Sequence, residues 1–243
     1  DMYYMNYHDK YLASLHADSK AELLKAFKQQ HIHPERLMKV LFTDTVYIQN
    51  TIHPSHFMEE LFYITINMQS HDEKELDLYH LFTPKECYEL WSCLNVLWYL
   101  DSGDTPLTER MMPYKEANLL RNILDTADSC IVREEPSATL RFGHESCLLP
   151  LAVLMGLGDC GYVTEDMETL AEHWQCYQYF PMASNIQLIF YRKPANKDIL
   201  VRVLLNEKET SLPVKTDCAP FYHWHDVSKY YRNKLTRYTS TDK

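Results

Sequence analysis

Features that would assign this chain of 243 residues to a membrane or to nucleic acid are missing. No continuous apolar run reaches about 18 residues, so a membrane-spanning helix is not expected. No cluster of Lys and Arg stands out and the formal net charge at pH 7 is -10, so a nucleic-acid partner is not expected. The length is enough for one large domain or two small ones, each with a hydrophobic core.

Paired cysteine motifs are also missing, and glycine is scarce. None of the seven cysteines belongs to a Cys-x-x-Cys pair, which excludes a zinc ribbon and a thioredoxin-type redox motif. Most of them lie in apolar stretches and are interpreted as small buried hydrophobic residues. The sequence also allows one or two disulfide bonds. Of five glycines, only Gly103 precedes Gly143, so the first half offers few sites for tight turns.

The first half of the sequence is predicted to be helical. Two segments have the spacing of a capping box, Ser19-Lys20-Ala21-Glu22 and Thr83-Pro84-Lys85-Glu86. Pro34 and Pro54 each suit the first turn of a further helix, because proline has no backbone N–H to leave unpaired there. An amphipathic helix is also expected over residues 113–131.

The second half changes character and predicts strands. A short strand is expected over Ala138–Phe142, followed by a helix over Ser146–Leu157. Two apolar segments within residues 186–205 predict an antiparallel hairpin, and a last helix is expected over His223–Leu235. The fold class predicted is α/β, with a strand–helix unit and an antiparallel hairpin beside a mainly helical region.

Chemistry is expected where the predicted strand meets the helix, at Gly143, His144 and Glu145. The N-terminus of a helix offers free N–H groups and a positive dipole end, which favour phosphate. An imidazole can donate to a phosphate oxygen, and a carboxyl group can protonate a leaving alkoxide. Two simpler interpretations stay open: Glu145 complements the helix dipole, and His144 caps the turn. Arg141 is expected to form an ion pair at the edge of the core.

A family resemblance adds to this interpretation. The stretch Arg141-Phe142-Gly143-His144-Glu145, with the following Leu-Leu-Pro-Leu and Met-Gly-Leu segments, resembles the second catalytic motif of the histidine acid phosphatases. This branch includes phytases and multiple inositol polyphosphate phosphatases. Bacterial members have segments similar to residues 186–191, 199–205 and 219–224. The resemblance covers about half of the chain, roughly residues 110–235.

The resemblance implies a fold, a reaction and a location. Residues 1–110 would form a helical cap domain and residues 111–243 the C-terminal part of the α/β core. His144 would bind a phosphate oxygen and Glu145 would protonate the leaving oxygen of a phosphate monoester, after a histidine elsewhere forms a phosphohistidine. Inositol polyphosphates are one candidate substrate class. The family needs no metal or other cofactor, and its members are exported, which implies a periplasmic or extracellular location.

The sequence departs from the family in one important respect. None of its 12 histidines lies in an Arg-His-Gly motif, which holds the family's nucleophile. The nucleophile is therefore expected in a missing N-terminal part of the same enzyme, and this chain alone is expected to be inactive.

Two other readings of the chain are a non-catalytic binding protein on the same fold and a metal-dependent hydrolase. The histidines of His53-x-x-His56 and His223-Trp224-His225-Asp226 are interpreted as surface or capping residues, because no partner completes a known ligand spacing.

Overall fold

The computed structural model describes residues 17–70, 76–133, 136–193 and 197–236. Contacts between Cα atoms divide the chain into a smaller unit, residues 18–97, and a larger unit that contains residues 98–243. No helix in the described ranges is both long enough and apolar enough to cross a membrane. The assignment of residues 1–110 as a cap domain and 111–243 as a phosphatase core stays a prediction.

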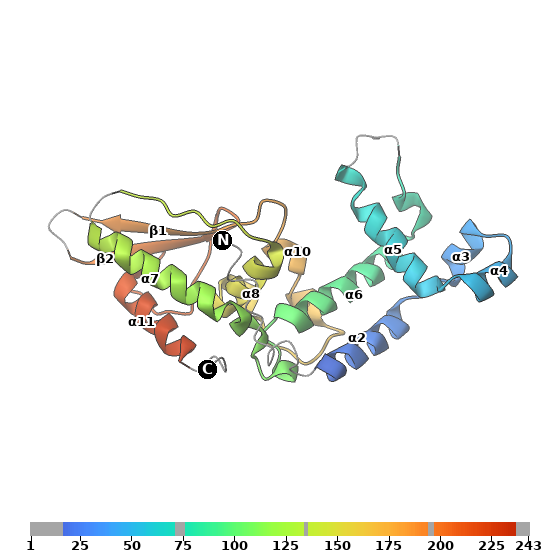
Figure 1. Cartoon of the computed structure of the whole chain (residues 1–243), viewed down its shortest axis with the longest axis horizontal. Coiled ribbons are helices and arrows are strands. Elements are labelled where there is room, and N and C mark those ends of the chain that lie inside the picture. The colour runs from blue at the N-terminus through green and yellow to red at the C-terminus, as the bar shows by residue number, and fades with distance from the viewer. Residues whose placement is uncertain (1–16, 71–75, 134–135, 194–196, 237–243) are drawn as a thin grey trace. The chain divides into compact units, whose positions relative to one another are not determined.

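The smaller unit is helical, as the sequence predicted (Figure 1). Its core brings together Leu37, Met58 and Phe62, all at most 5% exposed, and Phe82 meets Phe62 edge to face with ring centroids 5.9 Å apart. The helices of this unit are α2 (Ala17–His31), α3 (Glu35–Leu41), α4 (Thr45–Thr51), α5 (Pro54–Ile66) and the first part of α6 (Pro84–Ser102), with the 3-10 turns η2 (Met68–Ser70) and η3 (Tyr79–Leu81).

One of the two predicted capping boxes is confirmed. The backbone N–H of Thr83 donates to Glu86 Oε2 over 2.7 Å, and the backbone N–H of Glu86 donates to Thr83 Oγ1 over 3.2 Å. The box predicted at Ser19 is wrong, because α2 already includes Ala17 and so contains Ser19 inside the helix. Sequence spacing alone could not tell a cap from a position within the first turns. Pro54 opens α5 as predicted.

The larger unit contains a four-stranded antiparallel sheet. Strands β1 (Ile186–Arg192) and β2 (Ile199–Leu205) pair along their whole length, from Ile186 opposite Leu205 to Arg192 opposite Ile199. The short strands β3 (Lys208–Glu209) and β4 (Tyr222–His223) each pair with β2. The predicted hairpin is therefore confirmed, although residues 194–196 of its connection lie outside the described residues.

Two long helices of the larger unit, α7 (Ala117–Arg133) and α11 (Trp224–Leu235), lie side by side next to the sheet (Figure 1). The ring of Trp224 meets Phe190 of β1 edge to face at 4.9 Å, and its Nε1–H donates to Asp128 of α7 over 2.6 Å. Arg232 of α11 donates to the same carboxylate over 2.7 Å. One aromatic residue thus joins both helices and the sheet.

Besides α8 (Glu145–Met155), whose apolar residues are almost all buried, the larger unit contains several short helices. They are η4 (Pro106–Thr108), η5 (Met112–Glu116), η6 (Gly158–Gly161), α9 (Leu170–His173) and α10 (Cys176–Tyr179). Helix α8 packs mainly on η5, and also on η6 and α7. The α/β fold class, with helices and an antiparallel sheet, is confirmed.

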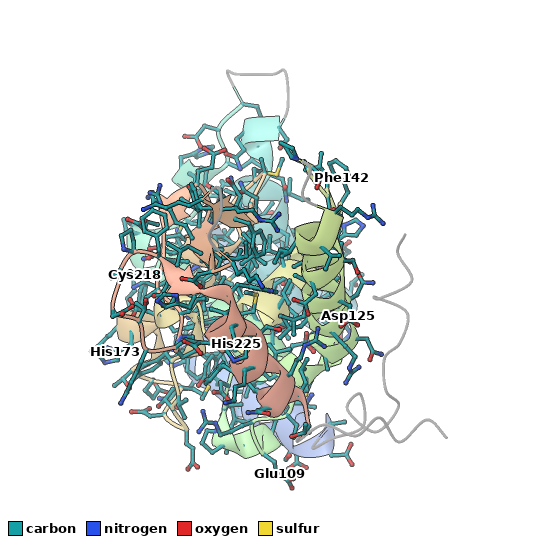
Figure 2. The ribbon with its side chains drawn as sticks, turned by 90° about the vertical axis from the view of Figure 1, so that its left-hand side faces the viewer. Glu109, Asp125, Phe142, His173, Cys218 and His225 are labelled. Atoms are coloured by element: carbon teal, nitrogen blue, oxygen red, sulfur yellow. The ribbon has the colours of Figure 1, made fainter. Side chains whose placement is uncertain are left out.

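The strand predicted over Ala138–Phe142 is wrong. Residues 136–143 follow an extended course in Figure 1 but belong to no strand, and they make no backbone hydrogen bond to another described residue. Leu140 and Phe142 are 76% and 87% exposed, and Phe142 is labelled at the surface in Figure 2. Local sequence favours an extended backbone here, but a strand also needs a paired neighbour, which a periodicity argument does not supply.

Candidate functional site

The predicted pair His144 and Glu145 stands at the start of α8. His144 is the residue before the helix and has an extended backbone, with φ -113° and ψ 166°, and Glu145 is the first helical residue. Both side chains are exposed. The imidazole of His144 makes no hydrogen bond to the helix, so the interpretation of His144 as a side-chain cap is wrong. Glu145 is the acidic residue of the first turn, as the dipole interpretation expects.

The first backbone N–H groups of α8 are available to a ligand. The His144 carbonyl accepts from the N–H groups of Cys147 and Leu148, both over 3.0 Å. The N–H groups of Glu145 and Ser146 donate to no other residue in the described part of the chain. Unpaired N–H groups at a helix start bind anions, and the helix dipole favours the same charge. The site thus offers two amides, one imidazole and one carboxyl group within three residues.

Helix α8 is held firmly at its other end. Gly156 follows it with a left-handed backbone, φ +65°, and the N–H of Leu157 donates to the Ala152 carbonyl over 3.1 Å. Side chains of α11 satisfy two of the last carbonyls: Tyr231 Oη donates to Met155 over 2.7 Å and Lys234 Nζ to Leu154 over 2.5 Å. This fixed helix sets the direction in which its N-terminal groups point.

A buried polar pair lies beneath the first turn of α8. Glu116 of η5 is 3% exposed and shares a hydrogen bond with the thiol of Cys147. Burial raises the pKa of Glu116 to about 7, against smaller lowering contributions from Cys147 and Lys115. Burial and the Glu116 carboxylate together raise the pKa of Cys147 to about 12, so this thiol stays protonated. The sequence analysis did not single out Glu116.

Arg141 forms no ion pair with any residue that the structure describes, so the ion pair predicted for it is not found there. Its guanidinium donates to Asn122 Oδ1 over 2.8 Å and to Thr126 Oγ1 over 2.9 Å, both on α7 and both neutral. The prediction considered charge partners, but the carboxylates of Asp125 and Asp128 on the same helix pair with Arg232 instead. Arg141 is therefore anchored to α7 by neutral groups.

Gly143 does not need to be glycine for the turn before His144. Its φ lies outside the left-handed region, and a Cβ added there would meet nothing within 4 Å. The sharp turn expected from glycine's conformational freedom is therefore not what this residue provides. What it does provide is open space directly beside His144.

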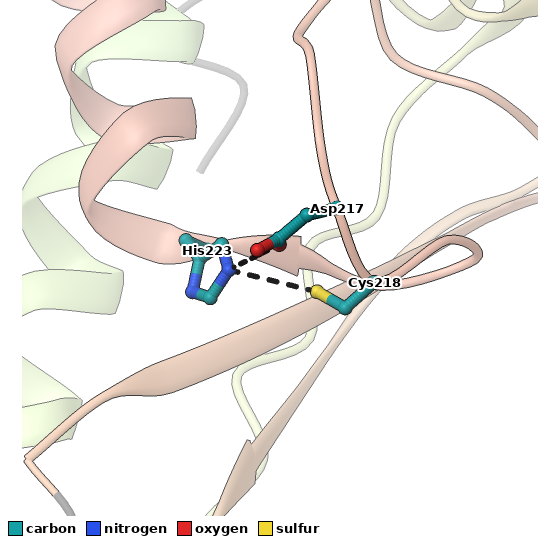
Figure 3. Close-up of side chains that lie close together, drawn as sticks. All are labelled: Asp217, Cys218 and His223. Atoms are coloured by element: carbon teal, nitrogen blue, oxygen red, sulfur yellow. Dashed lines mark hydrogen bonds and ion pairs between the residues drawn. The ribbon is translucent and has the colours of Figure 1, made fainter.

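The histidines of the other two motifs lie in different elements, near the start of α5 and near the start of α11. His53 precedes α5 and makes no capping hydrogen bond, and the His56 ring lies 3.9 Å from Glu60 on the same helix. His225 is exposed on the first turn of α11. His223, however, contacts Asp217 and Cys218 (Figure 3), and its other ring nitrogen contacts Asp198. Sequence spacing did not reveal this group, because the pairing of β2 with β4 brings Asp198 to His223 across 25 residues.

All seven cysteines are free, so the structure contains none of the disulfide bonds that the sequence allowed. Four of them, Cys93, Cys147, Cys160 and Cys176, are buried, as expected for small hydrophobic residues. Cys87, Cys130 and Cys218 are partly exposed.

Comparisons with known proteins identify a structural neighbour. The structure is similar to the crystal structure of multiple inositol polyphosphate phosphatase from Bifidobacterium longum in complex with inositol hexasulfate, with a TM-score of 0.77 and 15% sequence identity. The match covers 94% of this chain and 57% of the chain of that enzyme. No protein-family model and no curated protein sequence matches. The chain therefore has a phosphatase-like fold and spans little more than half the length of its neighbour.

Proposed function

We propose that this chain is the C-terminal portion of a histidine-type phosphomonoesterase. The start of α8 carries the proposal: His144 and Glu145 are adjacent and exposed, beside two N–H groups with no partner among the described residues. The likeness in fold to a multiple inositol polyphosphate phosphatase supports it. His144 binds a phosphate oxygen, and Glu145 donates a proton to the leaving oxygen.

The nucleophile lies outside this chain in the proposed enzyme. A histidine in the preceding part of the protein attacks the phosphorus and forms a phosphohistidine, while the bond to the leaving oxygen breaks and that oxygen takes the proton of Glu145. Water then hydrolyses the phosphohistidine and releases inorganic phosphate. This chemistry needs no metal. The preceding part of the same enzyme is thus the chain's main partner, and the chain alone is inactive.

The substrate is an organic phosphate monoester, with inositol polyphosphates as the preferred class. The neighbour's crystal structure holds inositol hexasulfate, a polyanion with the same ring and the same number of anionic groups as inositol hexakisphosphate. The open space beside Gly143 leaves room for a bulky polyanion at His144. The enzyme acts in the periplasm or outside the cell, which cell fractionation checks directly.

Substitutions in the complete protein that carries this chain test the proposal. Glu145→Gln should lower turnover of inositol hexakisphosphate about 100- to 10,000-fold, because the alkoxide then leaves without a proton. Turnover of an aryl phosphate with a good leaving group should fall much less. His144→Ala should weaken inhibition by vanadate. Matched controls are Glu172→Gln and His225→Ala, which are exposed residues elsewhere in the larger unit and should behave like the wild type.

A second candidate is a non-catalytic protein that binds phosphate ligands through the same helix start. A complete protein that holds no Arg-His-Gly motif at all would favour this candidate over the first. In that case the complete protein binds inositol hexasulfate, measured by calorimetry, and His144→Ala weakens the binding, but no phosphate is released from any ester. Unchanged turnover of inositol hexakisphosphate in Glu145→Gln would overturn the acid role in the first candidate.

A further inference from the structure

A second cluster of reactive side chains lies in the larger unit, between the end of the loop before β4 and the start of α11. Asp217 and Cys218 belong to a turn in which Thr216 Oγ1 accepts from the Cys218 N–H over 3.3 Å and the Phe221 N–H donates to the Cys218 carbonyl over 3.0 Å. This turn folds both side chains toward His223, the residue that precedes α11 (Figure 3).

The three side chains aim one atom each at a common point. His223 Nε2 lies 2.9 Å from Asp217 Oδ1 and 3.7 Å from Cys218 Sγ, and all three atoms lie within 4.8 Å of one another. In a tetrahedral zinc site, with bonds of about 2.0–2.3 Å, neighbouring ligand atoms are roughly 3.3–3.7 Å apart. The Asp217 side chain is 84% accessible, so its carboxylate has room to rotate toward this arrangement.

A fourth residue orients the imidazole. Asp198, just before β2, lies with Oδ2 at 2.8 Å from His223 Nδ1. A carboxylate that accepts from Nδ1–H fixes the tautomer with a lone pair on Nε2, and this outer contact accompanies most histidine ligands of metals. Pairing of Leu200 with His223 between β2 and β4 holds this contact in the sheet. Nε2 is therefore the ring nitrogen left to bind an ion on the side of Asp217 and Cys218, and without an ion its 2.9 Å contact with Asp217 requires a proton on Nε2.

An ion pair without any metal is the competing explanation. A protonated His223 between two carboxylates would show the same two short contacts with Asp198 and Asp217. That explanation leaves the Cys218 thiol with contacts to the Phe221 carbonyl over 3.5 Å and to Thr216 Oγ1 over 3.4 Å. It does not explain why the same Sγ, which is partly exposed, also lies 3.7 Å from His223 Nε2. The thiol is what separates the two explanations, because a soft sulfur ligand selects transition metals and has little to offer an ion pair.

We propose that Asp217, Cys218 and His223 bind a divalent transition metal ion of the zinc class, with Asp198 as the outer carboxylate and water as the fourth ligand. The thiol of Cys218 and the Nε2 position of His223 give up any protons they carry to solvent as the sulfur–metal and nitrogen–metal bonds form. The ion joins the 216–221 turn to the sheet and to the start of α11. This site is separate from the phosphate chemistry proposed at α8, which needs no metal.

Cobalt binding tests the proposal in the complete protein, purified without an affinity tag and stripped with a chelator. Co²⁺ should bind in one equivalent at this site and give a sulfur-to-cobalt charge-transfer absorption, which Zn²⁺ then displaces. Cys218→Ser should abolish this absorption. Asp198→Asn should keep the absorption but weaken Co²⁺ binding about 10- to 100-fold, because the histidine loses its orientation.

Matched variants distinguish this site from adventitious binding. Cys130→Ser removes another partly exposed thiol, and His225→Gln removes the neighbouring exposed imidazole, and neither should change the titration. The exposed Asp217→Asn provides a second test should Cys218→Ser fold poorly, and it should weaken binding. No stoichiometric Co²⁺ binding, or a charge-transfer absorption that survives Cys218→Ser, would overturn the proposal.

Discussion

Glu116 shows how a single buried carboxyl group can make the stability of a protein depend on pH. Its Oε2 atom has no hydrogen-bond partner in the described part of the chain, and the residue is 3% exposed. Burial raises the pKa of Glu116 from the usual value of 4.5 to about 7. Ionisation of this group is thus unfavourable in the folded protein.

We expect the contribution of Glu116 to the free energy of unfolding to fall as the pH rises. Between about pH 4.5 and 7 the folded protein holds a proton on Glu116 that the unfolded chain has released, so the folded state is favoured below this window and loses roughly 3 kcal/mol across it. Glu116→Gln should remove this loss and be more stable than the wild type at pH 8. Urea denaturation at a series of pH values measures the difference.

An exposed carboxyl group in the same unit serves as the comparison. Glu165→Gln should leave the pH dependence of the wild type intact, because Glu165 is exposed. If Glu116→Gln showed the same decline in stability between pH 5 and 8 as the wild type, the buried carboxyl group could not be its source. The Cys147 thiol is present in the wild type and in Glu116→Gln, so the packing beneath α8 is almost the same in these two proteins.

Substitution by alanine should have different effects on the stability of the protein at two glycines of the larger unit. A Cβ at position 103 would clash with the Tyr99 ring and would lie 2.6 Å from the Tyr99 carbonyl oxygen, whereas a Cβ at Gly143 would meet nothing within 4 Å. We expect Gly103→Ala to lower the free energy of unfolding by about 1–3 kcal/mol. Gly143→Ala should change it by less than about 0.5 kcal/mol. Thermal and urea denaturation of both variants check this, and a large loss in Gly143→Ala would contradict it.

At the scale of the element, a capping box defines the start of α6 in the smaller unit. Glu86 closes the capping box with Thr83 and also accepts two hydrogen bonds from Arg36, over 2.7 and 2.6 Å. Burial works against ionisation of Glu86, but the bonds from Arg36 and Thr83 outweigh it and lower its pKa. The stabilisation from this carboxylate is therefore present at neutral pH and is lost as the pH falls through the pKa of Glu86.

We expect Thr83→Ala to lower the free energy of unfolding by about 1 kcal/mol, because the Glu86 N–H loses its acceptor. Glu86→Ala should lower it by roughly 2 kcal/mol, since the link to α3 through Arg36 is lost as well. Glu60→Ala is the control: this residue is exposed on α5 and lies 3.9 Å from the His56 ring. Equal losses in Glu60→Ala and Glu86→Ala would contradict the role assigned to the box.

Elements whose signals are local could be predicted from the sequence, and those that depend on distant pairing could not. The box at Thr83, the proline that opens α5 and the hairpin of β1 and β2 all rest on neighbouring residues, and all are confirmed. The segment 138–142 has the composition of a strand but no partner in a ladder. Helix α4 is an exception: its start rests on a local cap, the Asp44 carboxylate that accepts from two backbone N–H groups, but the sequence analysis did not identify it.

At the scale of the whole molecule, the sequence predicted the fold class but only part of the chemistry. The adjacency of His144 and Glu145 follows from the chain itself, and their exposure at a helix start agrees with the expectation. Their roles remain a prediction. The group around His223 could not be predicted, because Asp198 reaches it only through the pairing of β2 with β4. Contacts of that kind are decided by the fold as a whole.

The net charge of -10 also belongs to this scale. A chain with so many acidic residues repels a polyanion over the distance that salt leaves unscreened, about 8–10 Å at physiological ionic strength. Two backbone N–H groups and one imidazole offset only part of that repulsion. The proposed enzyme therefore needs cationic side chains from its preceding part, which is consistent with a structural neighbour of which the match covers only 57%.

The exposed stretch from residue 136 to 143 offers a site at which limited proteolysis can probe this molecule. An extended, accessible backbone without hydrogen bonds to other described residues has the shape that the cleft of a digestive protease accepts. Chymotrypsin should nick the chain after Phe142, which is 87% exposed and two residues before His144. An anion bound at the start of α8 would shield this peptide bond. The rate of cleavage therefore reports how much of the protein has an anion bound there.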